Sequence, residues 1–97
     1  MVTYVHNVSY DIAEGNSYDE LYKFLDSFGN NYGRTTKSSF IVATTLTSKE
    51  FREQIRSKLG TNDKVFITTL VKGTSCWTNI IDSSEKLQAI FNQNSYK

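Results

Sequence analysis

Large apolar residues alternate with polar ones along several stretches of the chain, and this period of two predicts β-strands. One face of the first stretch carries most of its bulky side chains, which are Val2, Tyr4, His6, Val8, Tyr10 and Ile12. Residues 39–46 form a longer apolar run, as is typical of a strand near the middle of a sheet. We therefore expect four strands, at residues 2–12, 31–37, 39–46 and 64–72.

Other stretches show the i, i+3, i+4 spacing of an amphipathic helix. Residues 18–28 and 48–59 fit this spacing, and each is followed by a glycine that suits a helix end. A shorter helix near the C-terminus would turn Leu87, Ile90 and Phe91 inward. Each helix begins with a capping-box pattern, in which a short polar residue precedes Glu by three positions. The pairs are Ser17 with Glu20, Thr47 with Glu50, and Asp82 with Glu85.

The elements follow the order β-α-β-β-α-β and end in a C-terminal extension. This order predicts an α+β fold of the ferredoxin-like class, in which two helices cover one face of a four-stranded antiparallel sheet. We assign residues 1–78 to this domain and residues 79–97 to an extension with a short helix. Water, a partner or the extension would have to cover the opposite face of the sheet.

Composition narrows the functional classes. The chain has 97 residues, enough for one domain, and its eleven basic and ten acidic side chains give a net charge of +1. A dedicated nucleic-acid binder usually shows a clear positive excess, so we expect at most a local basic patch. The only cysteine is Cys76, which precludes an internal disulfide. We see neither a signal peptide nor an apolar run that could cross a membrane, and we expect a cytoplasmic protein.

The segment VSYDI, residues 8–12, resembles the first-strand signature of the second Cas protein of CRISPR adaptation. The chain also resembles small prokaryotic and phage proteins placed near that family, and this likeness covers residues 2–78. The shared features are SFIV at 39–42, LT at 46–47, NDK at 62–64 and Trp77. The family often has a basic pair shortly after its aspartate, where this chain has the acidic and polar sequence AEGNS.

The resemblance implies a ferredoxin-like homodimer that binds nucleic acid or phosphodiesters. Some members are metal-dependent nucleases and others are structural partners of the integrase, so the resemblance leaves open whether this chain is an enzyme. The family's key carboxylate corresponds to Asp11. This residue would hold Mg²⁺, which prefers oxygen ligands and can polarise a phosphoryl oxygen or activate water. Alternatively, Asp11 is solvated or caps the loop around Gly15.

Aromatic and basic residues supply further candidates. Arg34 and Lys37 would contact a phosphate while Tyr32 stacks on a base, and we include Tyr10 among these substrate-binding residues. The alternative is an ordinary edge strand protected by its charges. Trp77 would either anchor an interface or cover the end of the sheet.

Histidine and cysteine occur once each in the chain. We expect His6 to be packed in the fold or an interface, because a histidine-rich metal site needs a second histidine. We expect Cys76 to be a half-buried structural thiol, because it lacks a partner motif such as C-x-x-C.

These patterns leave two hypotheses. In the first, a Cas-type homodimer acts on nucleic acid or phosphodiesters as a metal-dependent nuclease, with Mg²⁺ at Asp11. In the second, a non-catalytic module binds a host or defence protein, or sequesters a nucleotide, in phage–host conflict. Both include a homodimer, because the open sheet face and the region of Trp77 offer apolar surface that such chains usually hide.

Overall fold

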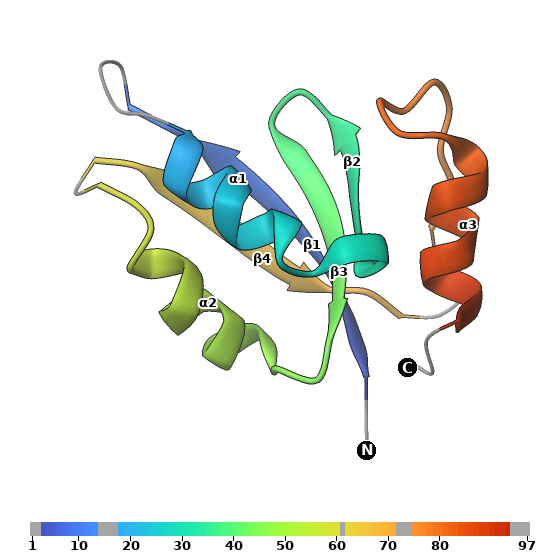
Figure 1. Cartoon of the computed structure of the whole chain (residues 1–97), viewed down its shortest axis with the longest axis horizontal. Coiled ribbons are helices and arrows are strands. Elements are labelled where there is room, and N and C mark those ends of the chain that lie inside the picture. Colours follow the sequence, from blue (N-terminus) through green and yellow to red (C-terminus); the bar gives the residue numbers. More distant parts are fainter. Residues whose placement is uncertain (1–2, 14–17, 61, 72–74, 94–97) are drawn as a thin grey trace.

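Four antiparallel strands form a single sheet in the computed structural model of the chain, and their spatial order is β2-β3-β1-β4 (Figure 1). The structure describes residues 3–13, 18–60, 62–71 and 75–93. Together with three α-helices the sheet makes a small α+β fold. The strands are β1 (Tyr4–Asp11), β2 (Tyr32–Thr36), β3 (Ser39–Thr44) and β4 (Lys64–Thr69).

The first strand, β1, lies inside the sheet and pairs with β3 on one side and β4 on the other. Val8 of β1 lies opposite Phe40 of β3 on one side and Ile67 of β4 on the other. The strand predicted at residues 2–12 is shorter in the structure, because Thr3 and Ile12 lie outside β1, and Val2 lies outside the described residues. The predicted strand at residues 64–72 stops at Thr69, and residues 72–74 lie outside the described part.

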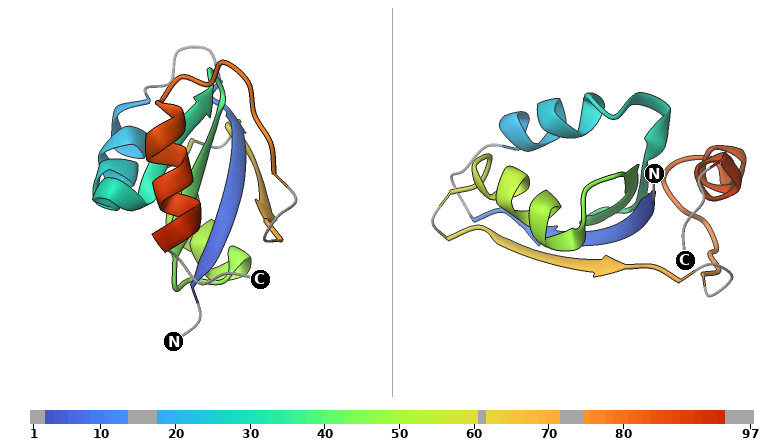
Figure 2. Two further views of the ribbon diagram at one scale, coloured as in Figure 1. Left: turned by 90° about the vertical axis from the view of Figure 1, so that its right-hand side faces the viewer. Right: turned by 90° about the horizontal axis from the view of Figure 1, so that it is seen from below.

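Two helices cover one face of the sheet, which we call the helix face (Figure 2). They are α1 (Asp19–Asp26) and α2 (Ser48–Arg56). Gly29 follows α1 with a φ of +57°, a left-handed conformation that suits glycine after a helix, and a short 3-10 turn, η1 (Gly29–Asn31), leads into β2. The buried core here comprises Val8, Tyr10, Ile12, Leu21, Leu25, Tyr32, Phe40, Val42, Phe51 and Ile55.

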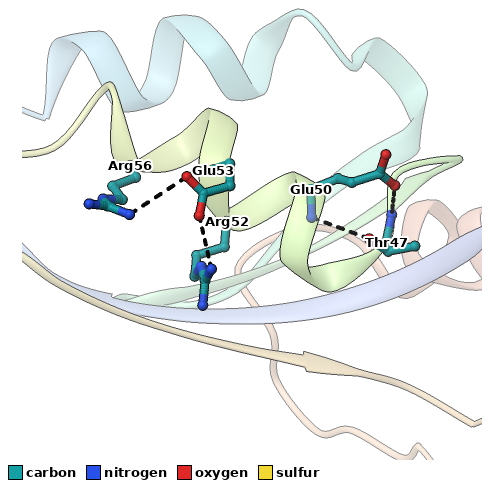
Figure 3. Close-up of polar contacts among 5 residues, drawn as sticks. All are labelled: Thr47, Glu50, Arg52, Glu53 and Arg56. Atoms are coloured by element: carbon teal, nitrogen blue, oxygen red, sulfur yellow. Dashed lines mark hydrogen bonds and ion pairs between the residues drawn. The ribbon is translucent and has the colours of Figure 1, made fainter.

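The structure confirms one of the three predicted capping boxes. The predicted pair at α2 is confirmed: the Thr47 hydroxyl accepts a hydrogen bond from the Glu50 N–H at 3.2 Å, and the Glu50 carboxylate accepts one from the Thr47 N–H at 2.9 Å (Figure 3). Ser17 lies outside the described residues, and Tyr18 occupies the N-cap position of α1 without a side-chain cap.

The third capping box was predicted wrongly. The helix α3 (Ser84–Gln93) is capped by Ser83, whose hydroxyl accepts a hydrogen bond from the Lys86 N–H at 3.1 Å. Asp82 lies one residue too early to cap this helix, and its carboxylate bonds to β2 instead.

The opposite side of the sheet, which we call the second face, is covered over part of its area by residues 75–93, the C-terminal cover. Figure 2 shows α3 beside the sheet on the side away from α1 and α2. Gly33 of β2 makes this close approach possible, because a Cβ at that position would lie 3.1 Å from Cδ1 of Ile90. A second buried core results, formed by Val5, Ile41, Ala43, Leu87, Ile90 and Phe91.

The cover also closes the outer edge of β2. The Ile81 N–H donates to the Thr35 carbonyl and the Asp82 N–H to the Arg34 carbonyl, each at 3.0 Å. In return, the Arg34 N–H donates to the Asp82 carboxylate at 2.6 Å, and the Lys86 ammonium lies 3.6 Å from the same oxygen. Asp82 therefore joins the edge strand to the start of α3.

Replacing Asp82 with Ala should loosen the C-terminal cover, because the partly buried Arg34 N–H loses its acceptor. We expect the free energy of unfolding to fall by about 1–3 kcal/mol, the usual cost of an unsatisfied buried group. Urea unfolding measures this loss. Glu85→Ala, at an exposed site in the first turn of α3, is the charge-matched control and should cost only a few tenths of a kcal/mol to about 1 kcal/mol. Equal losses in the two variants would show that Asp82 has no special role.

Candidate functional site

The part of the second face that the cover leaves open forms the candidate site. Along β1 and β4, Ser9 lies opposite Phe66, and Asp11 lies opposite Lys64. All four residues are exposed, and Phe66 exposes 70% of its surface, the largest fraction among the exposed bulky apolar residues that the structure describes. We call these four residues the open patch. A shallow hollow of about 250 Å³ lies along them.

Asp11 ends β1 within this open patch. Its neighbour across the strands is the cation Lys64 rather than a second carboxylate. Within the described residues no group of three or more His, Cys, Asp or Glu side chains comes together. A magnesium ion at Asp11 would therefore need most of its oxygen ligands from water, a phosphate or another copy of the chain.

Two of the four predicted substrate-binding residues lie on the other side of the sheet from Asp11. Tyr10 and Tyr32 belong to the core of the helix face, where they are 4% and 8% exposed. Both rings pack against Phe40 with centroids 5.6 Å apart, so neither presents an open face on which a base could stack. Burial raises the pKa of Tyr32 to about 12, so its hydroxyl stays protonated at neutral pH.

Arg34 and Lys37 do come together with Tyr10, around the turn between β2 and β3. The Lys37 carbonyl accepts hydrogen bonds from the Arg34 Nη2 at 3.1 Å and from the Tyr10 hydroxyl at 3.4 Å. The Arg34 guanidinium also lies 5.1 Å from the centre of the Tyr22 ring, a cation–π contact. Arg34 thus stabilises the turn and α1, and Lys37 is exposed.

Trp77 lies in the C-terminal cover and is half-buried. Its ring stacks on Phe91 of α3 with centroids 5.6 Å apart, and its indole N–H donates to the Ser84 hydroxyl at 3.1 Å. These contacts hold residues 75–80 against α3. Trp77 also lines a pocket and is accessible in part.

That pocket lies between the sheet and the cover and has a volume of about 440 Å³. It is lined by apolar residues such as Ile41 and Leu87 together with uncharged polar ones such as Asn7 and Thr36. No charged side chain is among the described lining residues. A nucleotide would have to place its phosphates elsewhere, because a buried phosphate needs cations or a run of N–H donors.

His6 is packed in the fold, as one of the sequence-based alternatives predicted, and is fully buried beside Phe51. Its Nε2 lies 2.9 Å from the Leu46 carbonyl, which can only accept, so Nε2 carries the proton. Nδ1 then accepts a hydrogen bond from the Thr69 hydroxyl at 3.0 Å. Burial lowers the pKa of His6 and so favours the neutral ring. Its contact with Phe51 of α2 places the ring on the helix face, away from the open patch.

Two features were missed or misjudged from the sequence. The prediction of a half-buried Cys76 is wrong, because its side chain is exposed. Phe66 was not among the predicted site residues. The alternation of KVFITT nevertheless predicts that its side chain and those of Val65 and Ile67 point to opposite faces of the sheet. With the face of these two residues assigned to the helices, the period of two would have placed Phe66 on the second face.

We compared the chain with known proteins and found no match: no family model matches it, and no curated protein or solved structure is detectably similar to it. Among the described residues, no helix has the length and apolar character that a membrane span requires.

The stability of the protein should depend on the protonation of His6. Because its pKa in the folded state is lowered, the unfolded chain takes up a proton near pH 6.5 that the folded protein excludes. Below that pH the free energy of unfolding should decrease by up to about 1.4 kcal/mol per pH unit, until the pKa of the folded state is reached. Above it this stabilisation is fully present.

Urea unfolding at several values between about pH 5.5 and pH 7.5, where the histidine side chain titrates, measures this dependence. His6→Gln keeps polar atoms at the site without a titrating group, so its stability should vary less over this range. The same slope in both proteins would mean that another group causes the pH dependence.

Proposed function

We propose that this protein is a ferredoxin-like binding module that forms a homodimer through the open patch. The order of its elements, β-α-β-β-α-β before α3, is that of the ferredoxin-like class. The resemblance of VSYDI, residues 8–12, to the second Cas protein of CRISPR adaptation adds support, because members of that family are small dimers of this class.

The observation that carries this proposal is the exposure of Phe66. A phenylalanine that exposes 70% of its surface in the middle of a strand leaves much apolar area in water. Burying that area would stabilise a complex by about 25 cal/mol for each Å² removed from water. Ser9, directly opposite Phe66, is small and leaves room for a bulky side chain.

The open patch is complementary to itself. A two-fold axis that runs parallel to β1 and β4, above the second face and midway between the two strands, places β1 of one copy over β4 of the second copy. In the resulting contact Phe66 of one copy lies over Ser9 of the second copy. Asp11 of one copy then meets Lys64 of the second, so each carboxylate is neutralised by an ammonium group.

This arrangement favours binding over catalysis, because the carboxylate that would hold a metal is paired with a cation. The only histidine is buried on the helix face, so no general base of that kind lies beside Ser9 or Asp11. We therefore assign the open patch to association and not to phosphodiester cleavage.

The dimer should respond to charge reversal. Asp11→Lys and Lys64→Asp should each weaken dimerisation by tenfold or more, because each places like charges together within the contact. The double variant restores opposite charges and should dimerise again. Sedimentation equilibrium measures the dissociation constants of the four proteins.

Lys58→Glu, a change at an exposed residue that follows the end of α2, serves as the control for net charge and should leave the dimer intact. A wild-type protein that stays monomeric at its highest soluble concentration would contradict the proposal. So would a double variant that dimerises no better than the single ones.

A metal-dependent phosphodiesterase is the second candidate, and the exposed carboxylate of Asp11 at the end of β1, beside the hollow of the open patch, favours it. If this candidate holds, Mg²⁺ added to the protein should shift the NMR signals of Ser9 and Asp11. The wild-type protein should also cleave a single-stranded oligonucleotide when Mg²⁺ is present, and Asp11→Asn should abolish this cleavage. Cleavage that survives this substitution would remove Asp11 from the mechanism. If the wild-type protein shows neither cleavage nor Mg²⁺-dependent shifts, the second candidate is ruled out and the binding module remains.

A further inference from the structure

The two edge strands of the sheet, β2 and β4, differ in the hydrogen bonding of their outer sides. At one edge, residues 81–82 and the carboxylate of Asp82 form hydrogen bonds with the backbone of Arg34 and Thr35 in β2. At the other edge lies β4, and no strand among the described residues pairs with its outer side. Its sequence KVFITT is rich in β-branched residues and carries only one charge, so it lacks the usual protection of an edge strand.

A groove runs beside this edge, between β4 and the first turns of α2. It has a volume of about 360 Å³ and is lined by Ser48, Lys49, Arg52, Val65, Phe66 and Ile67. Figure 3 shows Arg52 extending from α2 toward the strands. The groove therefore offers backbone donors and acceptors on one side and side chains of α2 above them.

Charge distinguishes this groove from the rest of the edge. Its two charged lining residues, Lys49 and Arg52, are both cations. Glu53 accepts a hydrogen bond from Nη2 of Arg52 at 2.9 Å, but a guanidinium has five N–H donors. The groove also lies at the start of α2, where the helix dipole adds positive potential.

We propose that the outer edge of β4 accepts an extended acidic segment of a partner protein as a fifth strand. The main chain of the segment would pair with β4, as in other cases of strand addition. The acidic side chains would reach Lys49 and Arg52 in the groove. This site uses the edge and the helix face, whereas the proposed dimer uses the second face.

The geometry of the strand specifies the sequence of the partner. Val65 and Ile67 point to the helix face, so every second residue of an added strand lies on the side of Lys49 and Arg52 and should be Asp or Glu. The residues between them lie beside Phe66 and should be uncharged and apolar. The partner segment is therefore an alternation of acidic and apolar residues.

A second copy of this chain fits the edge less well. Antiparallel two-fold pairing of β4 with itself would place both α2 helices on the same face, so the cations of the two grooves would face each other across the junction. The strand β4 itself contains no acidic residue that could neutralise them. The charges of the groove thus favour an acidic partner over self-pairing.

The experiment uses the whole protein and two fluorescent peptides, one alternating Glu with Val and one alternating Lys with Val. Anisotropy should show binding of the Glu peptide and at least tenfold weaker binding of the Lys peptide. NMR should show shifts of the amides of β4 and the first turns of α2 on addition of the Glu peptide. A Glu peptide with N-methylated backbone positions should not bind, because strand pairing needs its N–H groups.

The double variant Lys49→Glu and Arg52→Glu should lose at least tenfold in affinity for the Glu peptide. Lys23→Glu with Lys58→Glu changes the net charge equally at exposed sites outside the groove and should bind like the wild type. The proposal is overturned if the Lys peptide binds equally well, if the N-methylated peptide binds, or if the shifted amides lie away from β4. Binding that is lost only in the control variant would also overturn it.

Discussion

The hydrogen bonds that join residues 81–82 to β2 determine which surfaces of this small protein remain available. The Arg34 N–H donates to Asp82 at 2.6 Å, and the same carboxylate lies 3.6 Å from Lys86 in α3. This link brings Leu87, Ile90 and Phe91 onto the second face, where they bury Val5 and Ile41. One edge and part of one face are thereby closed, and the other edge and the rest of that face stay open.

The two open surfaces share a strand but differ in chemistry. The open patch presents Phe66 beside one acid and one base, Asp11 and Lys64, which suits contact with an identical surface. At the edge of β4 no strand of the described part of the chain pairs with its outer side, and two cations of α2 line the groove beside it, which suits an acidic strand. The sheet also separates Asp11 from Tyr10 and Tyr32, because successive residues of a strand point to opposite faces. The predicted metal ligand and these two predicted substrate-binding residues therefore lie on opposite faces of the sheet.

The parts of the fold that depend on local pattern could be predicted from the sequence. Alternation together with one longer apolar run predicted four strands, and Thr47 with Glu50 marked the start of α2 correctly. The role of Asp82 could not be predicted, because its partner Arg34 is 48 residues away and a capping pattern offered a nearer explanation. The burial of Tyr32 depends equally on distant packing against Phe40. The importance of Phe66 depended on knowing how much of the second face the C-terminal cover would leave open.

The C-terminal cover closes one part of the second face, and we propose that the other part associates with a second copy of the chain. A dilution series of NMR spectra of the wild-type protein tests it most directly, because contact with a second copy changes the surroundings of the residues involved. The account predicts concentration-dependent shifts at Ser9, Asp11, Lys64 and Phe66, and constant signals for Leu87 and Ile90 beneath the cover. Signals that do not change with concentration, or changes centred on α3, would contradict it.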